Sequence, residues 1–451
     1  MSKSYNLTVN EMAASPKAYS VTTAEFHSNN GLVVNIKNIV KDIKIIESIY
    51  NSSLTIKIFI LDSIGLIDYL KISGNEKITL VIERKDIVSK VSKNFNLDVF
   101  IGEVRDYSTP SPSSKAYTLF CVSKHAYLNT ISVVKRTFDN TPSALIKSLC
   151  KNELDSDIDI RNPSTTPIKG IFPHIRPLSA ISWLLRNSYE DSTPNFFYET
   201  AKSGLIFNSY KKMLAEDVYN DYNNNPNFRS ESENTMEDLY TEEQLKIQKV
   251  LGQTLNLSKY NASMNGAFGS TLHTIDIYNK KYPKVVYGYD NPQKMDKLNN
   301  EPPINDIVNA VGVIKFNQQK DAKNYFISYN SGAFDGKDNY HAPTNQSILK
   351  AEAYHHNLDT IKQELLLTGD FDLECGMIIN LDLLKTADIT EEMIASEEFK
   401  DETLSGNHLV TGIVHHFSSD GYFMNVTAKK DSFIKELKGI KGEKKNDKEK
   451  R

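Results

Sequence analysis

A regular alternation of side chains at Leu54–Asp62 is the feature that most constrains the fold of this chain. In "LTIKIFILD" every second residue from position 56 is isoleucine, so one face of an extended strand is apolar. Ser73–Glu83, "SGNEKITLVIE", gives a turn and a second strand. Strand patterns at 95–108 and 115–127 follow, separated by a Pro/Ser-rich loop. Because turns and not helices separate these strands, the sequence predicts an antiparallel sheet or barrel.

Helical patterns begin only after about Leu128. The stretch "TPSALIKSLCKNEL" starts with Thr141 as the N-cap and Pro142 at the first helical position, and "PLSAISWLLRNS" starts in the same way at Pro177. A predicted hairpin, "NFFYETAKSGLIFNSY", comes next. The middle of the chain is therefore predicted to be α+β. It ends in the polar, Asn-rich stretch 220–238, which we interpret as a linker or a long surface loop.

Strand patterns return in the last part of the chain. A helix is predicted over 345–361, and "LLLTGDFDLECGMIINL" at 365–381 consists of two short apolar runs around two glycines. "HLVTGIVHHF" and "YFMNVTAKK" then form a predicted hairpin that turns at Gly421. The charged residues 438–451 are predicted to be disordered.

Composition and charge exclude several classes of protein. The net charge of −4 gives no general basic surface for nucleic acid. No apolar run approaches the roughly 20 residues of a membrane helix, and residues 1–20 lack the apolar core of a signal peptide. Three cysteines far apart make neither a disulfide framework nor a cysteine zinc site credible, so we expect assembly in a reducing cytoplasm.

A search for chemistry identifies no catalytic constellation. The adjacent pairs His355-His356 and His415-His416 cannot chelate a metal alone, because neighbouring residues point in different directions. The alternating acids of Glu153–Ile160 lack the spacing of an EF-hand loop. Asp370 and Asp372 could be ligands, although turn formation accounts for them. The sequence therefore predicts no catalytic residue, no cofactor and no metal site.

The order of several motifs resembles the baseplate hub proteins of T-even-type contractile-tailed phages. A strand runs into a "D…G.E" element, for which the sequence has Asp62, Gly74 and Glu76. "KAYTLFCVSKHAY" is similar to the next family segment, although His125 stands where an acid is usual. The units "FPHIRPLSAISWLLRNS", "FFYET" and "SGLIFNSY" follow in the family's order. Residues 365–381 resemble the family's "l.v.Gd..l..G..i.l" element, with Cys375 where proline is common.

The resemblance implies a mainly β fold with α+β insertions and two antiparallel β-barrels of tail-tube type. It implies a homotrimeric hub ring in the phage tail baseplate that joins the six-fold tail tube to the three-fold central spike and leaves a lumen for DNA. Tail tube proteins and the central spike protein are the implied partners, with baseplate wedge proteins as further candidates and without specific nucleic-acid or stable membrane binding. The protein would be a virion component assembled in the host cytoplasm. Another tail-tube-end component and a hub-associated cell-wall-degrading enzyme stay open as alternatives.

The resemblance also implies domain limits and structural turns. A first barrel is expected over 25–128, an α+β domain with the Asn-rich loop over 129–238, and a second barrel over 239–437 with a small domain inserted near 291–361. Gly74, Gly369, Gly376 and Gly421 are expected to form tight turns. We expect the runs at 365–367 and 377–381 to be neighbouring strands. Subunit contacts are expected near Leu54–Leu61 and His408–Phe417, where apolar residues occupy both faces.

Overall fold

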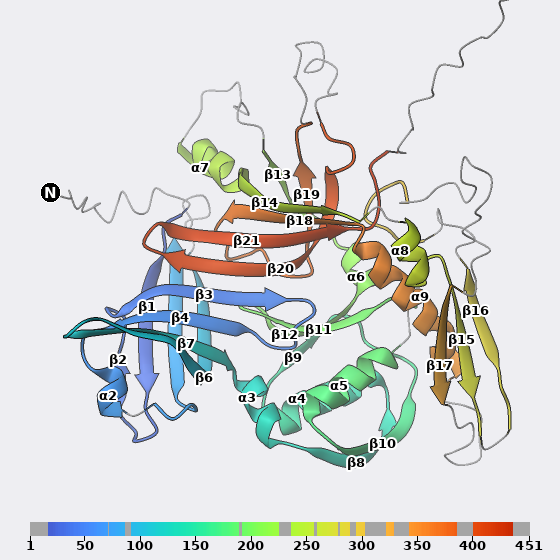
Figure 1. The fold of residues 1–451 in the computed structure, drawn as a ribbon, viewed down its shortest axis with the longest axis horizontal. Coiled ribbons are helices and arrows are strands. Elements are labelled where there is room, and N and C mark those ends of the chain that lie inside the picture. The colour runs from blue at the N-terminus through green and yellow to red at the C-terminus, as the bar shows by residue number, and fades with distance from the viewer. Residues whose placement is uncertain are drawn as a thin grey trace, which may run out of the picture.

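The computed structural model describes most of the 451 residues of the chain. The described ranges are 17–70, 72–85, 92–188, 192–224, 236–256, 259–277, 280–288, 295–302, 322–328, 342–385 and 400–435. The fold is mainly β with helices concentrated in the middle, as the sequence predicted (Figure 1). In these ranges no helix is both long and apolar enough to span a membrane. The predicted disordered tail and most of the Asn-rich loop lie outside the described residues.

One 13-stranded sheet contains two groups of strands. The N-terminal group pairs in the order β3-β4-β7-β6-β5-β1-β2. Its strands are β1 (Ser20–His27), β2 (Val33–Asn35), β3 (Val40–Ser48), β4 (Thr55–Asp62), β5 (Lys77–Lys85), β6 (Ser92–Ser111) and β7 (Ser114–Ser123). The short helix α2 (Leu66–Leu70) lies between β4 and β5. Side chains of β4 alternate between buried and partly exposed, as the isoleucine pattern predicted.

The C-terminal group pairs in the order β14-β18-β21-β20-β19-β13. Its strands are β13 (Val218–Asn223), β14 (Ile247–Leu255), β18 (Ile361–Thr368), β19 (Ile378–Asp382), β20 (Gly406–Ser418) and β21 (Gly421–Lys430). The helix α7 (Met236–Leu245) precedes β14. Thus β3-β4-β7-β6-β5 and β14-β18-β21-β20-β19 have the same connectivity, and all pairs within these two sets are antiparallel.

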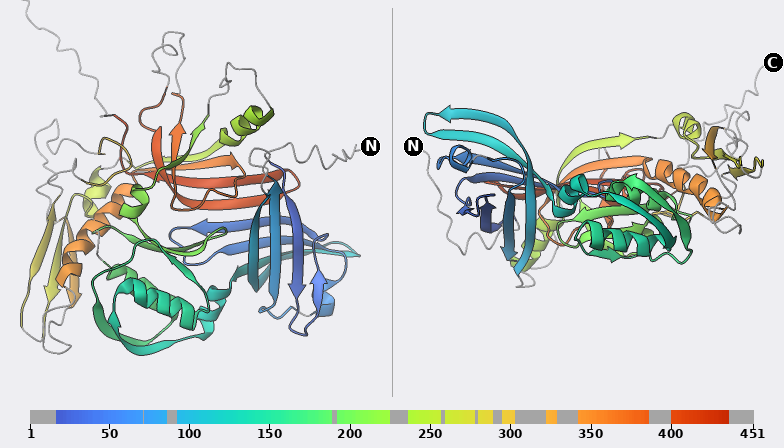
Figure 2. Two further views of the ribbon diagram at one scale, coloured as in Figure 1. Left: turned by 180° about the vertical axis from the view of Figure 1, so that it is seen from behind. Right: turned by 90° about the horizontal axis from the view of Figure 1, so that it is seen from below.

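The two groups are joined edge to edge. Residues 412–417 of β20 pair antiparallel with β3, so both groups belong to one continuous sheet (Figures 1 and 2). The path runs from β14 at one end to β2 at the other, and none of the sheets formed by the described residues closes. One hydrophobic core extends through both groups, because buried residues from β1 to β21 form a single cluster.

A smaller α+β region lies beside the sheet. Its core is separate and includes Ile146, Leu184, Phe197 and Phe207. Its elements are α3 (Lys124–Ile131), β8 (Val134–Asn140), α4 (Pro142–Glu153), β9 (Ile158–Ile160), β10 (Ile168–Ile175), α5 (Pro177–Arg186), β11 (Asn195–Thr200), β12 (Gly204–Ser209) and α6 (Tyr210–Leu214). Both α4 and α5 carry proline in the first turn, where the missing N–H has no helical partner to lose.

A further small sheet lies at the opposite side of the molecule from the N-terminal group (Figure 1). It contains β15 (Gly269–Ile275), β16 (Lys284–Gly288) and β17 (Lys323–Ser328). The helix α9 (Ala342–Leu358) packs against β15 and β16, and α8 (Lys259–Met264) precedes them. Most of the expected insertion near 291–361 lies outside the described residues.

The connection from β18 to β19 corrects one prediction. These strands are not neighbours, because the β20–β21 hairpin lies between them in the order β18-β21-β20-β19. Residues 369–377 therefore cross the hairpin instead of forming a tight turn between adjacent strands. The Gly369 N–H donates to the Tyr422 carbonyl at 3.0 Å, and the Gly376 N–H donates to the Val410 carbonyl at 2.8 Å. Phe371, Leu373 and Cys375 are buried along this crossing segment.

Candidate assembly site

The crossing from β4 to β5 is organised by two buried carboxylates. Asp62 accepts hydrogen bonds from the N–H groups of Ile64, Gly65 and Ile67 and from the Tyr117 hydroxyl. Burial alone would raise the pKa of Asp62, but the backbone hydrogen bonds outweigh it and lower the pKa below its usual value. The carboxylate therefore holds the first turn of the segment that follows β4.

Glu76 organises the second half of that crossing. Its Oε1 accepts from the Ser73 N–H and hydroxyl at 2.8 Å each, and its Oε2 accepts from the N–H groups of Gly74 and Asn75. Burial opposes the charge, yet these hydrogen bonds lower the pKa of Glu76 overall. Gly74 has φ +96, in the left-handed region that glycine adopts without strain. Asp62 and Glu76 thus hold the two ends of the crossing, and Gly74 supplies the turn before β5.

Glycines also shape the equivalent crossing of the C-terminal group. Gly376 has φ +92, and a Cβ there would lie 2.5 Å from the Tyr198 hydroxyl. Gly369 has an ordinary φ, but a Cβ would lie 2.0 Å from the Tyr422 ring, so this position needs glycine for space. At the hairpin turn, Gly421 has φ +119.

Asp370 and Asp372 both have protein partners. Asp370 accepts from the Asp372 N–H at 2.9 Å and from the Tyr219 hydroxyl at 2.7 Å. Asp372 forms ion pairs with Lys93 of β6 and Lys202 of the β11–β12 turn. These contacts lower the pKa of Asp372 against the opposing effect of burial. The segment is therefore fastened to both strand groups and to the middle region.

A buried polar chain lies at the joint between β3 and β20. The His415 Nε2 lies 3.1 Å from Glu47 Oε1, and its Nδ1 lies 2.7 Å from the Tyr422 hydroxyl, which donates to the Asp370 carbonyl at 3.0 Å. Because the Tyr422 hydroxyl proton is used in the bond to Asp370, Nδ1 is the donor to Tyr422, and a further hydrogen bond joins Nε2 to Glu47. Glu47 Oε2 also accepts from the Ala201 N–H. Glu47 and His415 are only 2% and 1% exposed, so these hydrogen bonds lie enclosed within the joint, where a satisfied polar network rigidifies the packing.

The other predicted histidines and acids do not gather into a site. His408 is buried and donates from Nδ1 to the Gly406 carbonyl, and burial lowers its pKa to about 3. Burial also lowers the pKa of His355. Asp159 pairs with Arg161. Across the described ranges, no group of three or more His, Cys, Asp or Glu side chains could hold a metal ion. The three cysteines are buried and free, and burial raises their pKa values.

Within the two repeated sets β3-β4-β7-β6-β5 and β14-β18-β21-β20-β19, two edges are open in the described residues. The first strand of the C-terminal group, β14, pairs only with β18. The second edge is the distal half of β6, residues 103–111, which pairs with β7 alone and extends beyond the other strands of its group (Figure 2, right). Leu251, Leu255 and Tyr107 are exposed along these edges. Each exposed edge presents unpaired backbone N–H and C=O groups with which another strand can pair.

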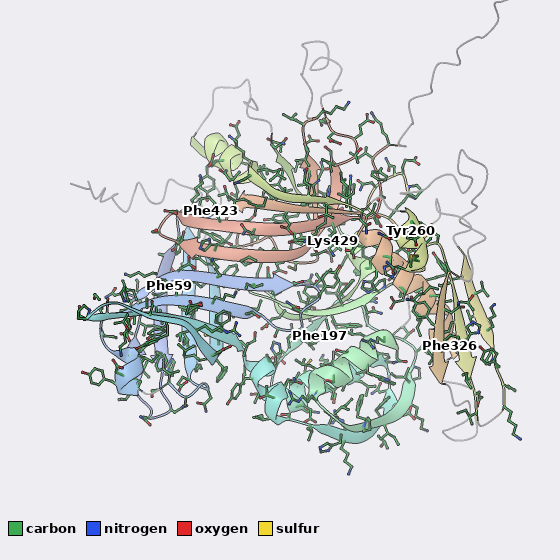
Figure 3. All side chains as sticks on the ribbon, in the orientation of Figure 1. Phe59, Phe197, Tyr260, Phe326, Phe423 and Lys429 are labelled. Atoms are coloured by element: carbon green, nitrogen blue, oxygen red, sulfur yellow. The ribbon has the colours of Figure 1, made fainter. Side chains whose placement is uncertain are left out.

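The two segments expected to form subunit contacts are paired along their edges within the chain. Residues 408–417 belong to β20, whose distal half already pairs with β3 of the same chain, and Leu409 is fully buried. Residues 54–61 lie in β4, which is covered on both edges by β3 and β7. Phe59 is 37% exposed on the face of that sheet (Figure 3). A subunit contact at these segments therefore stays a prediction for the exposed face around Phe59, while Leu409 belongs to the core.

Sequence reasoning missed the buried contacts that hold these elements together. Glu47, His415, Tyr117 and Tyr422 come from strands far apart in the chain. A charged residue inside an apolar strand, such as Glu47 in "KIIES", is the one local signal that could have indicated a buried partner.

Comparison with known proteins identifies the class of this fold. No protein-family model matches the chain, and no curated protein matches its sequence. The solved structure of a tail protein from Neisseria meningitidis aligns over 92% of this chain and 97% of its own, with 11% identity and a TM-score of 0.50. The 43 kDa tail protein of prophage MuSo2 from Shewanella oneidensis aligns over 91% of this chain and 99% of its own, with 10% identity and a TM-score of 0.51.

The chain therefore shares its fold, over nearly its whole length, with tail proteins. At this level of identity the likeness concerns the fold, and the particular role must be argued from the strand groups and their open edges.

Proposed function

We propose that this chain is a structural component of a phage tail baseplate, a homotrimeric hub ring between the six-fold tail tube and the three-fold central spike. The observation that carries the proposal is the repeated strand group. The orders β3-β4-β7-β6-β5 and β14-β18-β21-β20-β19 are the same within one chain. Three chains would then present six similar strand groups under three-fold symmetry, which resolves the mismatch between tube and spike.

The fold likeness to tail proteins and the motif order of the hub family support the same role. In this role the ring belongs to the virion, encloses a lumen for DNA and contacts tail tube and spike proteins. The net charge of −4 fits a lumen that does not retain DNA. We also propose that the chain is divided into two domains built on the strand groups, a middle domain and a small inserted domain.

The alternatives are less well supported. A tube-end protein with a single strand group would not need the second group that this chain contains. A cell-wall-degrading enzyme would need a pair of carboxylates in a cleft open to substrate. The Glu47–His415 pair is enclosed between strands, so its geometry favours a structural role.

Electron microscopy of the purified chain tests the proposal. We expect class averages of a ring with three-fold symmetry and six similar lobes around a central opening. The same sample mixed with the spike protein should gain density on one face of the ring. Particles of single-chain size in both samples would contradict the hub role, and hydrolysis of purified peptidoglycan would favour the enzyme instead.

A further inference from the structure

We propose that the distal half of β6 in one copy pairs antiparallel with β14 of the next copy, forming between chains the joint that β20 and β3 form within one chain. This inference rests on the proposed ring and specifies how its copies meet. Both strands have an open edge in the described residues. The partner is a second copy of this chain, because each open strand is the structural equivalent of a strand that is already joined.

The equivalence between β6 and β20 is residue by residue. Phe100 lies opposite Lys77 and Val122, and Leu409 lies opposite Ile378 and Lys429. Each strand changes its neighbour at this position. Up to this position β6 pairs with β5, and β20 pairs with β19. From this position onward β6 pairs with β7, and β20 pairs with β21.

A bulge supports the same alignment. The register with β7 shifts between Ile101 and Glu103, and the register with β21 shifts between Val410 and Gly412. Beyond the bulge, Glu103, Val104 and Arg105 therefore correspond to Gly412, Ile413 and Val414. A bulge fixes the register of a strand pair. If one strand shifted by one residue, the bulge would fall at a different residue and the side chains would turn to the opposite face.

The equivalence between β3 and β14 follows from their shared neighbour positions. The β3–β4 ladder shifts between Val40 and Asp42, and the β14–β18 ladder shifts between Ile247 and Lys249. β14 has one further bulge, between Val250 and Gly252. The residue pairs of both ladders can be counted from the first bulge, with the second bulge of β14 skipped. The pair Ile46–Thr55 then corresponds to the pair Thr254–Lys362.

The internal joint then predicts the register between copies. Inside the chain, Ile413 lies opposite Glu47 and Val414 lies opposite Ile46. By correspondence, Val104 of one copy should lie opposite Leu255 of the next, and Arg105 opposite Thr254. Leu255 is 50% exposed in the single chain, and this contact would cover it. The β6–β7 and β20–β21 hairpins differ after Arg105, because Asp106 has φ +54 and β6 shifts register again. The correspondence therefore ends at Arg105.

Engineered disulfides test this register. In the full chain carrying Arg105→Cys and Thr254→Cys, oxidation should give covalent dimers and trimers on a non-reducing gel. The matched control is Ile46→Cys with Val414→Cys, the corresponding pair of the internal joint, which should oxidise within one chain and leave the monomer band. Opposed strand residues lie within the usual Cα range of a disulfide. The native Cys121, Cys150 and Cys375 are buried and should not contribute.

Each outcome decides a separate point. Covalent dimers and trimers from the double variant, and not from Arg105→Cys or Thr254→Cys alone, would support the edge pairing. A ring of native mass in which the control pair oxidises but the test pair does not would overturn the edge pairing and leave the hub role intact. A sample that stays monomeric even with the spike protein present, and in which the control pair still oxidises, would overturn both. A disulfide between the two introduced thiols of one chain would leave the band at monomer mass, and this result would also count against the edge pairing.

Discussion

At the scale of single residues, Gly376 illustrates what a short sequence motif can predict. The two glycines of "GDFDLECG" suggested special backbone positions, and Gly376 has φ +92. No local signal indicated that Gly369 is needed for space against Tyr422, because the aromatic neighbour lies more than fifty positions away in the chain. Local conformation can be predicted from a motif, whereas a close approach depends on the finished fold.

Gly376→Ala should lower the free energy of unfolding by more than the positive φ angle alone would explain. The left-handed conformation costs a residue with a side chain about 1 kcal/mol. The added Cβ would also meet the Tyr198 hydroxyl at 2.5 Å. Gly204→Ala is the matched control, because Gly204 has φ +72 with open space around its Cβ position. Thermal unfolding should show a larger loss for Gly376→Ala, and equal losses would contradict the close contact.

Because of His408, the free energy of unfolding should decrease as the pH falls. Its pKa is about 3 in the folded protein, against an ordinary value of 6.5. The folded state keeps the ring neutral while the unfolded state binds a proton, so this contribution is complete above pH 6.5 and declines as pH falls toward 3. The slope is at most about 1.4 kcal/mol per pH unit. His408→Asn should flatten the slope in denaturant titrations between pH 6.5 and 4, and an unchanged slope would contradict the assignment. Measurement at about pH 8, where the ring is neutral in both states, gives the packing cost separately.

At the scale of elements, the sequence predicted strands and hairpins better than their order in the sheet. The β20–β21 hairpin was evident from alternation and from the turn at Gly421. The position of this hairpin between β18 and β19 could not be predicted, because alternation shows which face of a strand is buried but not which strand lies beside it. The repeated strand order was equally hard to predict, since equivalent positions such as Phe100 and Leu409 carry different side chains.

The turn before β5 should depend on the Glu76 carboxylate. Glu76→Gln keeps the size of the side chain but replaces one acceptor oxygen by an amide, and we expect a loss of about 1–2 kcal/mol near neutral pH. The folded-state pKa of Glu76 is lowered, so its stabilisation is present above its ordinary value of 4.5 and disappears as pH falls further. Glu402→Gln, which alters only an exposed ion pair with Lys435, is the control. Equal urea midpoints for the two variants would argue against the turn's dependence on Glu76.

At the scale of the whole molecule, the central claim is that one chain supplies two equivalent parts of a larger ring. The continuous sheet, the internal joint and the two open edges follow from the pairing of the strands. The sequence suggested two barrel-like units through a resemblance, but the edges that remain open could be identified only after the internal joint had been located. The strands at 54–61 and 408–417 pair along their edges with strands of the same chain, so the subunit contacts expected there stay a prediction for the faces of the sheet.

The native mass of the full chain in solution tests this claim most directly. Native mass spectrometry at low salt and sedimentation at physiological salt should both give three times the chain mass of 51.0 kDa, and the mass of bound spike should add to this when the spike protein is present. Leu255→Glu should shift the mass toward one chain, because it places a charge at the proposed edge contact, whereas Ile277→Glu, in the exposed turn that follows β15, should leave it unchanged. A wild-type chain that stays monomeric at high concentration, with its spike present, would contradict the account.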